Sequence, residues 1–170
     1  MRTKLPVLIM IITGWSLAAS AQVVTADPVF PVASGPVVIT FHADMGDMGL
    51  KDYSGDDVYA HTGVITNLST GPSNWKYVVS GTWSTTTPPP DKVKLTRVGS
   101  NTYTLTISPS IRAFYGVPES ETIQQMAFVF RNGNASRTGR DDGGGDIFYN
   151  VSEEAGFEIL LSQPSAYTSL

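Results

Sequence analysis

The sequence predicts an all-β sandwich of about eight short antiparallel strands with one short helical turn. Two observations lead to this prediction. Apolar and polar residues alternate over several short runs, which is the pattern of half-buried strands. Clusters of Gly, Pro, Ser, Asn and Asp separate these runs, as turns do between short strands.

The first predicted strands lie in the N-terminal half of the chain. In residues 36–43 (PVVITFHA), the residues at odd positions share an apolar face. Residues 58–65 (VYAHTGVI) and 75–79 (WKYVV) are the second and third predicted strands.

The clearest hairpin spans residues 94–107 (KLTRVGSNTYTLTI). Its predicted turn is Gly99-Ser100-Asn101, after which Tyr103, Leu105 and Ile107 alternate with threonines.

The C-terminal half completes the set of predicted elements. Residues 126–131 (MAFVFR) are apolar on both faces and predict a central strand, and residues 147–151 and 157–161 predict the last two strands. Only residues 110–117 have helical spacing, long enough for one or two turns. The proline-rich residues 85–90 predict an exposed loop. This arrangement is typical of an immunoglobulin-like sandwich.

Residues 1–21 have the features of a secretory signal peptide. Arg2 and Lys4 precede the largely apolar residues 5–17, and Ala19-Ser20-Ala21 has the small-x-small pattern of a cleavage site. The apolar run is shorter than the roughly 20 residues of a membrane-spanning helix. We therefore expect a secreted, cell-surface or periplasmic bacterial protein with no membrane association after cleavage.

The remaining chain divides into three predicted parts. Residues 22–35 are expected to be an irregular lead-in segment, and residues 36–162 the folded module. Residues 163–170 are expected to be a linker or the beginning of a further domain of a longer polypeptide.

Composition limits the classes of partner. Loss of Arg2 and Lys4 with the signal would change the formal charge from −4 to −6, which argues against nucleic acid or an anionic membrane as partner. The chain has no cysteine, which excludes disulfides and thiolate metal sites and agrees with bacterial export.

No catalytic motif is evident, and we expect a protein that is not itself an enzyme. The only histidines are His42 and His61, and neither lies in a motif with a nucleophile. Asp141, Asp142 and Asp146 form an acidic cluster with three interpretations: solvated turns, weak calcium ligands or a carboxylate pair for catalysis. Solvated turns are the simplest interpretation, so no cofactor is expected, with calcium as the alternative.

The aromatic residues allow two interpretations. Tyr59 and His61 share one face of their predicted strand, and Trp75 and Tyr77 share a face of theirs. If the two strands pair, these rings could form an exposed platform for sugar rings. The alternative is that Trp75 and Tyr77 are ordinary core residues.

Several motifs occur in an order that resembles a known group of proteins. They are VYAHTG (58–63), Trp75, KLTRVGSNTYTLTI (94–107), MAFVFRNGN (126–134) and RDDGGGDIFY (140–149). Over residues 36–162 the chain resembles the starch-binding modules of carbohydrate-binding families twenty-five and twenty-six. It is also similar to N-terminal modules of secreted bacterial α-amylase-like proteins.

The resemblance implies an immunoglobulin-like fold and binding of a polysaccharide, an α-glucan such as starch. It implies that His61 and Trp75 contact the sugar, with Asp141 and Asp142 at the rim. Arg140 stands where those modules place a second stacking tryptophan. A guanidinium can also lie flat on a sugar.

If Arg140 does not fill that role, Trp83 or Tyr149 would have to supply the second ring. The combined expectation is a non-catalytic, α-glucan-binding accessory module of a secreted amylase-like glycoside hydrolase. The alternatives are a structural spacer domain without a ligand, which buried rings at Trp75 and Trp83 would favour, and a calcium-stabilised adhesion domain.

Overall fold

The structure, a computed structural model, describes residues 22–85 and 87–153. The predicted signal peptide, the predicted strand over 157–161 and the predicted linker lie outside the described residues.

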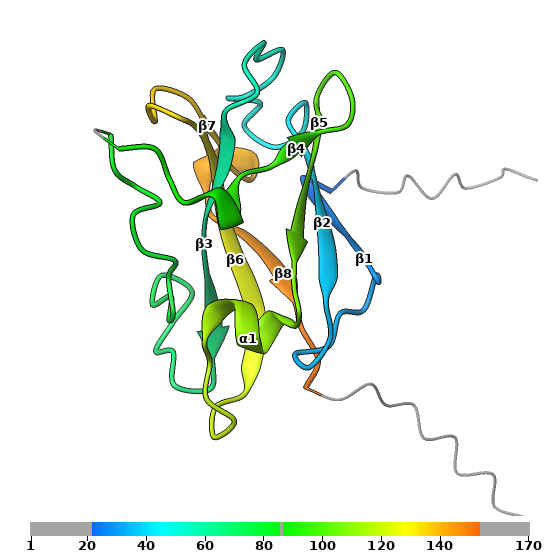
Figure 1. Cartoon of the computed structure of the whole chain (residues 1–170), viewed down its shortest axis with the longest axis vertical. Helices are drawn as coiled ribbons and strands as arrows, with labels where there is room; N and C mark the ends of the chain where they lie inside the picture. Colours follow the sequence, from blue (N-terminus) through cyan, green and yellow to red (C-terminus); the bar gives the residue numbers. More distant parts are fainter. Residues whose placement is uncertain (1–21, 86, 154–170) are drawn as a thin grey trace, which may run out of the picture.

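The described chain forms two antiparallel sheets that face each other (Figure 1), so the predicted all-β sandwich is confirmed. One sheet has the order β1-β2-β5-β4, and in the other β6 lies between β3 on one side and β7 and β8 on the other. The strands are β1 (Val24–Asp27), β2 (Val37–His42), β3 (Val58–Thr66), β4 (Thr96–Arg97), β5 (Thr102–Ile107), β6 (Ile123–Asn132), β7 (Thr138–Gly139) and β8 (Ile147–Asn150).

The core lies between the sheets and follows from the alternation in the strands. In β2 every second residue is buried, among them Ile39 and Phe41. Phe41 stacks on Phe130 of β6 with ring centres 4.0 Å apart, and Phe128 stacks on Phe130 at 5.7 Å. These rings join the two sheets.

Strand β6 is buried on both faces, as its apolar run predicts. Phe128 and Phe130 lie in the core, and the alternation of a strand places Val129 and Arg131 on the opposite, outer face. Both outer residues are nevertheless buried, at 2% and 0% exposure. Other parts of the chain therefore cover the outside of this sheet.

The covering segment is the chain that follows β3. Lys76 and Val64 of β3 donate backbone hydrogen bonds to each other, and Val79 N–H donates to the carbonyl of Thr62. The expectation of a strand over residues 75–79 is wrong: there is a single bridge, because Tyr77 has a positive φ of 51° that interrupts the extended backbone.

The N-terminal segment also differs from expectation. Residues 22–35 were expected to be an irregular lead-in, but Val24–Asp27 form β1, which pairs with β2 at the edge of its sheet. The four residues of β1 are too few to show a clear period in the sequence.

The predicted hairpin and helical turn are both present. In the hairpin, Val98 N–H donates to the carbonyl of Thr102 around the predicted turn. The helix α1 (Ile111–Tyr115) begins where the hydroxyl of Ser110 accepts from Ala113 N–H, and ends at Gly116, whose φ is 74°. Figure 1 places α1 across one end of the sandwich. No helix in the described part of the chain has the length and apolar character needed to cross a bilayer.

Candidate ligand-binding pocket

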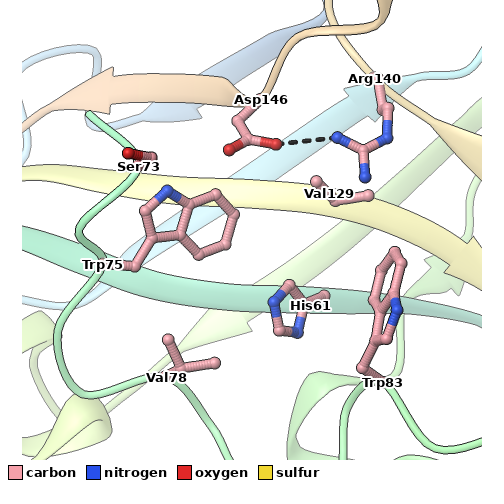
Figure 2. A pocket seen from close by; sticks show the side chains of 8 residues that line it. All are labelled: His61, Ser73, Trp75, Val78, Trp83, Val129, Arg140 and Asp146. Carbon is pink, nitrogen blue, oxygen red and sulfur yellow. Dashed lines mark hydrogen bonds and ion pairs between the residues drawn. The ribbon is translucent and has the colours of Figure 1, made fainter. Parts of the chain in front are cut away.

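A hollow of about 500 Å³ lies on the outer face of the sheet that contains β3 and β6. His61 of β3 pairs with Val129 of β6 and the two form its floor, while the chain after β3 and the chain between β7 and β8 form its walls. The lining residues, shown in Figure 2, are His61, Ser73, Trp75, Val78, Trp83, Val129, Arg140 and Asp146.

Two tryptophans flank the histidine on the floor of this pocket. The rings of Trp75 and His61 are stacked, with centres 5.4 Å apart and planes 26° apart. The ring of Trp83 lies 4.9 Å from His61 at 59°. Trp83 is 46% exposed and Trp75 is half-buried, so neither ring belongs to the core between the sheets. Figure 2 shows the two indoles on opposite sides of the imidazole.

The hydrogen bonds of His61 define its tautomer. The Nδ1 atom lies 2.7 Å from the hydroxyl oxygen of Thr82, and that hydroxyl donates its only proton to the carbonyl of Val79 at 2.8 Å. His61 Nδ1–H is therefore the donor to Thr82. In the neutral ring, Nε2 then carries a lone pair and is a hydrogen-bond acceptor.

The surroundings of His61 favour this neutral form. Burial lowers the pKa of His61, the positive charges of Arg140 and Arg131 lower it further, and Asp146 partly opposes them. At neutral pH the floor of the pocket consequently presents an uncharged ring with one acceptor nitrogen.

An ion pair supplies the charged part of the pocket wall. Arg140 donates from its guanidinium to a carboxylate oxygen of Asp146 at 2.8 Å, and both side chains are about one-third exposed or less. The backbone is fixed here by Asp47, whose carboxylate accepts from Arg140 N–H at 2.9 Å. The pair places N–H donors and carboxylate acceptors beside the aromatic rings, as Figure 2 shows.

The indole N–H of Trp75 has no acceptor among the described residues, although the nitrogen is buried. An unsatisfied buried donor costs about 1–3 kcal/mol. Phe148 holds the ring from the edge, with ring centres 6.3 Å apart. This indole is therefore held in place by packing, with an unused donor beside the pocket.

Three of the residues expected to contact a sugar lie in this pocket: His61, Trp75 and Arg140. Arg140 is present as half of an ion pair, and Trp83 supplies the second indole. Tyr149, the other candidate for that ring, donates its hydroxyl to the carbonyl of Val29 and does not line the pocket.

The other four expected residues lie elsewhere. Tyr59 is buried at 6% exposure with the Lys94 ammonium 6.0 Å from its ring centre, and the hydroxyl of Tyr77 donates to Glu121. Asp141 and Asp142 are exposed and lie beside a different hollow near the N-terminal residues of the domain. Tyr77 points away because the chain after β3 is a loop with a left-handed residue, not a strand.

Asp146 was expected only as a member of the acidic cluster, and neither Val129 nor Ser73 was among the expected site residues. The alternation in β6 identifies Val129 as the outward neighbour of His61 once the pairing of β3 and β6 is known. Trp83 lies in a segment without periodicity, and only the folded loop brings it to His61.

The acidic cluster does not converge on a single point. Within residues 22–85 and 87–153, no group of three or more His, Cys, Asp or Glu side chains is placed to hold a metal ion. The Asp146 carboxylate bonds to Arg140 instead of facing Asp141 and Asp142.

The chemistry that these groups offer is recognition of a neutral polar molecule with flat apolar faces. The rings supply apolar surface, His61 supplies an acceptor, and Arg140 and Asp146 supply a donor and an acceptor at the rim.

The chain matches no protein-family model, and a search of curated proteins finds no significant match.

Proposed function

We propose that the chain is a non-catalytic carbohydrate-binding module that holds an α-glucan in the pocket between Trp75 and Trp83. The observation that carries the proposal is the placement of the half-buried Trp75 and the 46%-exposed Trp83 on either side of His61. A pyranose ring has an apolar C–H face that packs on an indole and hydroxyls around its edge. The pocket offers indole rings for the apolar face and polar side chains for the hydroxyls.

The polar groups suit sugar hydroxyls in particular. A hydroxyl can donate to Nε2 of His61 and accept from the guanidinium of Arg140. Asp146 supplies further acceptors, and among the residues that line the pocket its carboxylate is the only one. Hydrolysis by the usual pair of opposed carboxylates would need a second. Binding is therefore the activity that these side chains support best.

In this proposal the module belongs to a secreted bacterial glycoside hydrolase of the amylase type and acts through proximity. Binding to the polymer would hold a neighbouring catalytic domain near its substrate and raise the effective substrate concentration. The resemblance described above supports this context, as does the predicted export signal.

The direct test is electrophoresis of the chain from residue 22 onward in a native gel containing soluble starch. We expect Trp75→Ala and Trp83→Ala each to weaken affinity by about 2 kcal/mol, or roughly 30-fold, and to run faster than the parent. Phe30→Ala is the matched control, because Phe30 is 85% exposed and does not line the pocket. Retardation of both tryptophan variants equal to that of the parent would exclude this site.

The second candidate function is a structural spacer without a ligand. Val29 and Phe30 favour it, because they are 63% and 85% exposed and lie close to the bridge between Val32 and Ser152 at the end of the described chain. Exposed apolar residues at such a place suit packing against a neighbouring domain. If soluble starch and glycogen do not retard the parent protein in the gel, and the protein does not bind maltoheptaose, the spacer function is favoured.

A further inference from the structure

Arg131 lies behind the pocket and is fully buried, at 0% exposure. It is two residues beyond Val129 on the outer face of β6 and pairs with Tyr59 of β3. The sugar-binding proposal assigns it no role, since its side chain does not line the hollow.

The guanidinium of Arg131 binds the backbone on both sides of Trp83. One terminal nitrogen donates to the carbonyl of Thr82 at 3.0 Å and to the carbonyl of Ser84 at 2.8 Å. The other nitrogens donate to the carbonyls of Asn132 and Gly133 at the end of β6. Arg131 therefore connects the end of β6 to the carbonyls of the two residues that flank Trp83.

Arg131 is also next to the ring itself. Its central carbon lies 5.9 Å from the centre of the Trp83 indole. A second link reaches the same loop, because His61 Nδ1–H donates to the hydroxyl of Thr82. Trp83 is 46% exposed, so packing alone gives its ring limited restraint, and these hydrogen bonds hold the backbone that carries it.

A contribution to folding stability does not by itself explain why a cationic side chain is buried at position 131. Each of the four hydrogen bonds that Arg131 donates ends on a backbone carbonyl, and none ends on a carboxylate. Burial disfavours the charged form and lowers the pKa of Arg131. An apolar side chain of similar volume often stabilises a fold as well as a buried charge does, but it cannot hold two carbonyls in a fixed geometry.

We propose that Arg131 is a positioning residue that fixes the Trp83 indole at the wall of the pocket. The proposal rests on the proposed carbohydrate-binding function for its effect on affinity, but the ordering of Trp83 is independent of any ligand. Preorganisation of this kind strengthens binding by removing the cost of ordering the ring when the ligand arrives.

The first test measures the order of the ring without ligand. In the chain from residue 22 onward, the ¹⁵N–¹H heteronuclear NOE of the Trp83 indole is expected to be that of a rigid group. Arg131→Met should lower it to the value of a mobile side chain, while the Trp75 indole keeps its value as the internal control. An unchanged Trp83 value in a folded variant would overturn the proposal.

Arg131→Lys covers the case in which Arg131→Met does not fold. It keeps a cation in place but loses the other two nitrogens of the planar group, which bond to the carbonyls of Asn132 and Gly133 and so fix the nitrogen that reaches Thr82 and Ser84. We expect it to lower the Trp83 NOE as well, with the core amide resonances unchanged. A lysine variant with the parent's NOE would contradict the proposal.

The second test is a double-mutant cycle with maltoheptaose as the probe, by calorimetry. We expect Arg131→Met, or Arg131→Lys where the methionine variant does not fold, to weaken binding about tenfold in the parent and less than about twofold in a Trp83→Ala background. An equal loss in both backgrounds would mean that Arg131 acts on the pocket as a whole and would overturn the role assigned here. If the parent binds none of starch, glycogen and maltoheptaose, the proposed function fails, and the NOE measurement still decides whether Arg131 orders Trp83.

Discussion

The two faces of strand β6 carry aromatic clusters that differ in almost every physical respect. On the inner face, Phe130 lies 4.0 Å from Phe41 and is completely buried. On the outer face, Trp83 lies 4.9 Å from His61 and leaves 46% of its surface to solvent. The inner rings of Phe41, Phe128, Phe130 and Tyr103 carry no charge at neutral pH, whereas the outer cluster has the ion pair of Arg140 and Asp146 beside its histidine.

If the proposed function is correct, one strand serves stability on its inner face and recognition on its outer face. The inner rings come from strands in both sheets and exclude water, so they contribute to folding. The outer indoles come from a loop, and hydrogen bonds to β3 and β6 hold that loop in place. Removing an inner ring should therefore unfold the protein more easily, and removing an outer ring should change binding.

The largest expected effect breaks the inner cluster. Phe130→Ala should lower the free energy of unfolding by about 3–5 kcal/mol, because it leaves a cavity between the sheets. Urea denaturation measures this change. Trp83→Ala is the matched outer variant and should cost less than about 1 kcal/mol. If Phe130→Ala and Trp83→Ala lowered the free energy of unfolding equally, the outer cluster would be a second core.

A smaller loss of stability is expected from adding a methyl group to the packed core between the sheets. In Gly139→Ala, the new methyl group would lie 2.5 Å from Cζ of Phe41 and must displace it. We expect a loss of about 1–3 kcal/mol in urea denaturation. Gly145→Ala is the control, since its methyl group meets no atom within 4 Å, and it should stay within about 0.5 kcal/mol of the parent.

On the outer face, loss of the charged wall should change affinity more than stability. Arg140→Gln removes a half-buried donor and its ion pair, and we expect roughly fivefold weaker binding of maltoheptaose with less than about 1 kcal/mol lost in stability. Arg97→Gln is the matched control, because Arg97 pairs with Asp56 outside the pocket. If calorimetry shows that Arg140→Gln binds maltoheptaose as tightly as Arg97→Gln does, a role for Arg140 in binding is excluded.

The smallest expected effect is a dependence of stability on pH between about pH 7 and pH 5, which comes from the histidine of the outer cluster. Burial lowers the pKa of His61 in the folded state below the usual value of about 6.5. As the pH falls below about 6.5, the unfolded chain takes up a proton that the folded chain does not, so stability decreases through the folded pKa and is constant above about 6.5.

His61→Gln removes the group responsible and should reduce this acid-side loss of stability, measured as Tm between about pH 7 and pH 5. Glucan affinity of the parent should fall over the same range, because protonation converts the Nε2 acceptor into a donor. An acid-side slope in His61→Gln equal to that of the parent would assign the effect to other groups.

The sheets were predictable where alternation decides the outcome. Strands β2 and β5 follow directly from residues 37–42 and 102–107, and the doubly apolar run around Phe128 identifies the centre of the second sheet. The short edge strand β1 was not predictable, because pairing with β2 defines it and its own pattern does not. Tyr77 adopts a left-handed conformation that no local signal marks in a run of strand-forming residues.

The pocket was predictable only in part. His61, Trp75 and Arg140 follow from the order of motifs along the chain. Trp83 reaches the same place because the loop after β3 returns to the sheet, which depends on contacts between residues far apart in sequence, such as Arg131 with Thr82. Arg131 gives no signal in the sequence, since an arginine at the end of an apolar strand usually indicates a solvent-exposed end.

The loop that carries the two tryptophans has a consequence for the solution behaviour of the protein. Its hydrogen bonds at Lys76 and Val79 occupy backbone groups of β3 that would otherwise form an open sheet edge. Open edges are where β proteins pair with one another and aggregate. A natural or engineered change that loosens this segment should therefore give a protein that both binds less and self-associates more, even with its core intact.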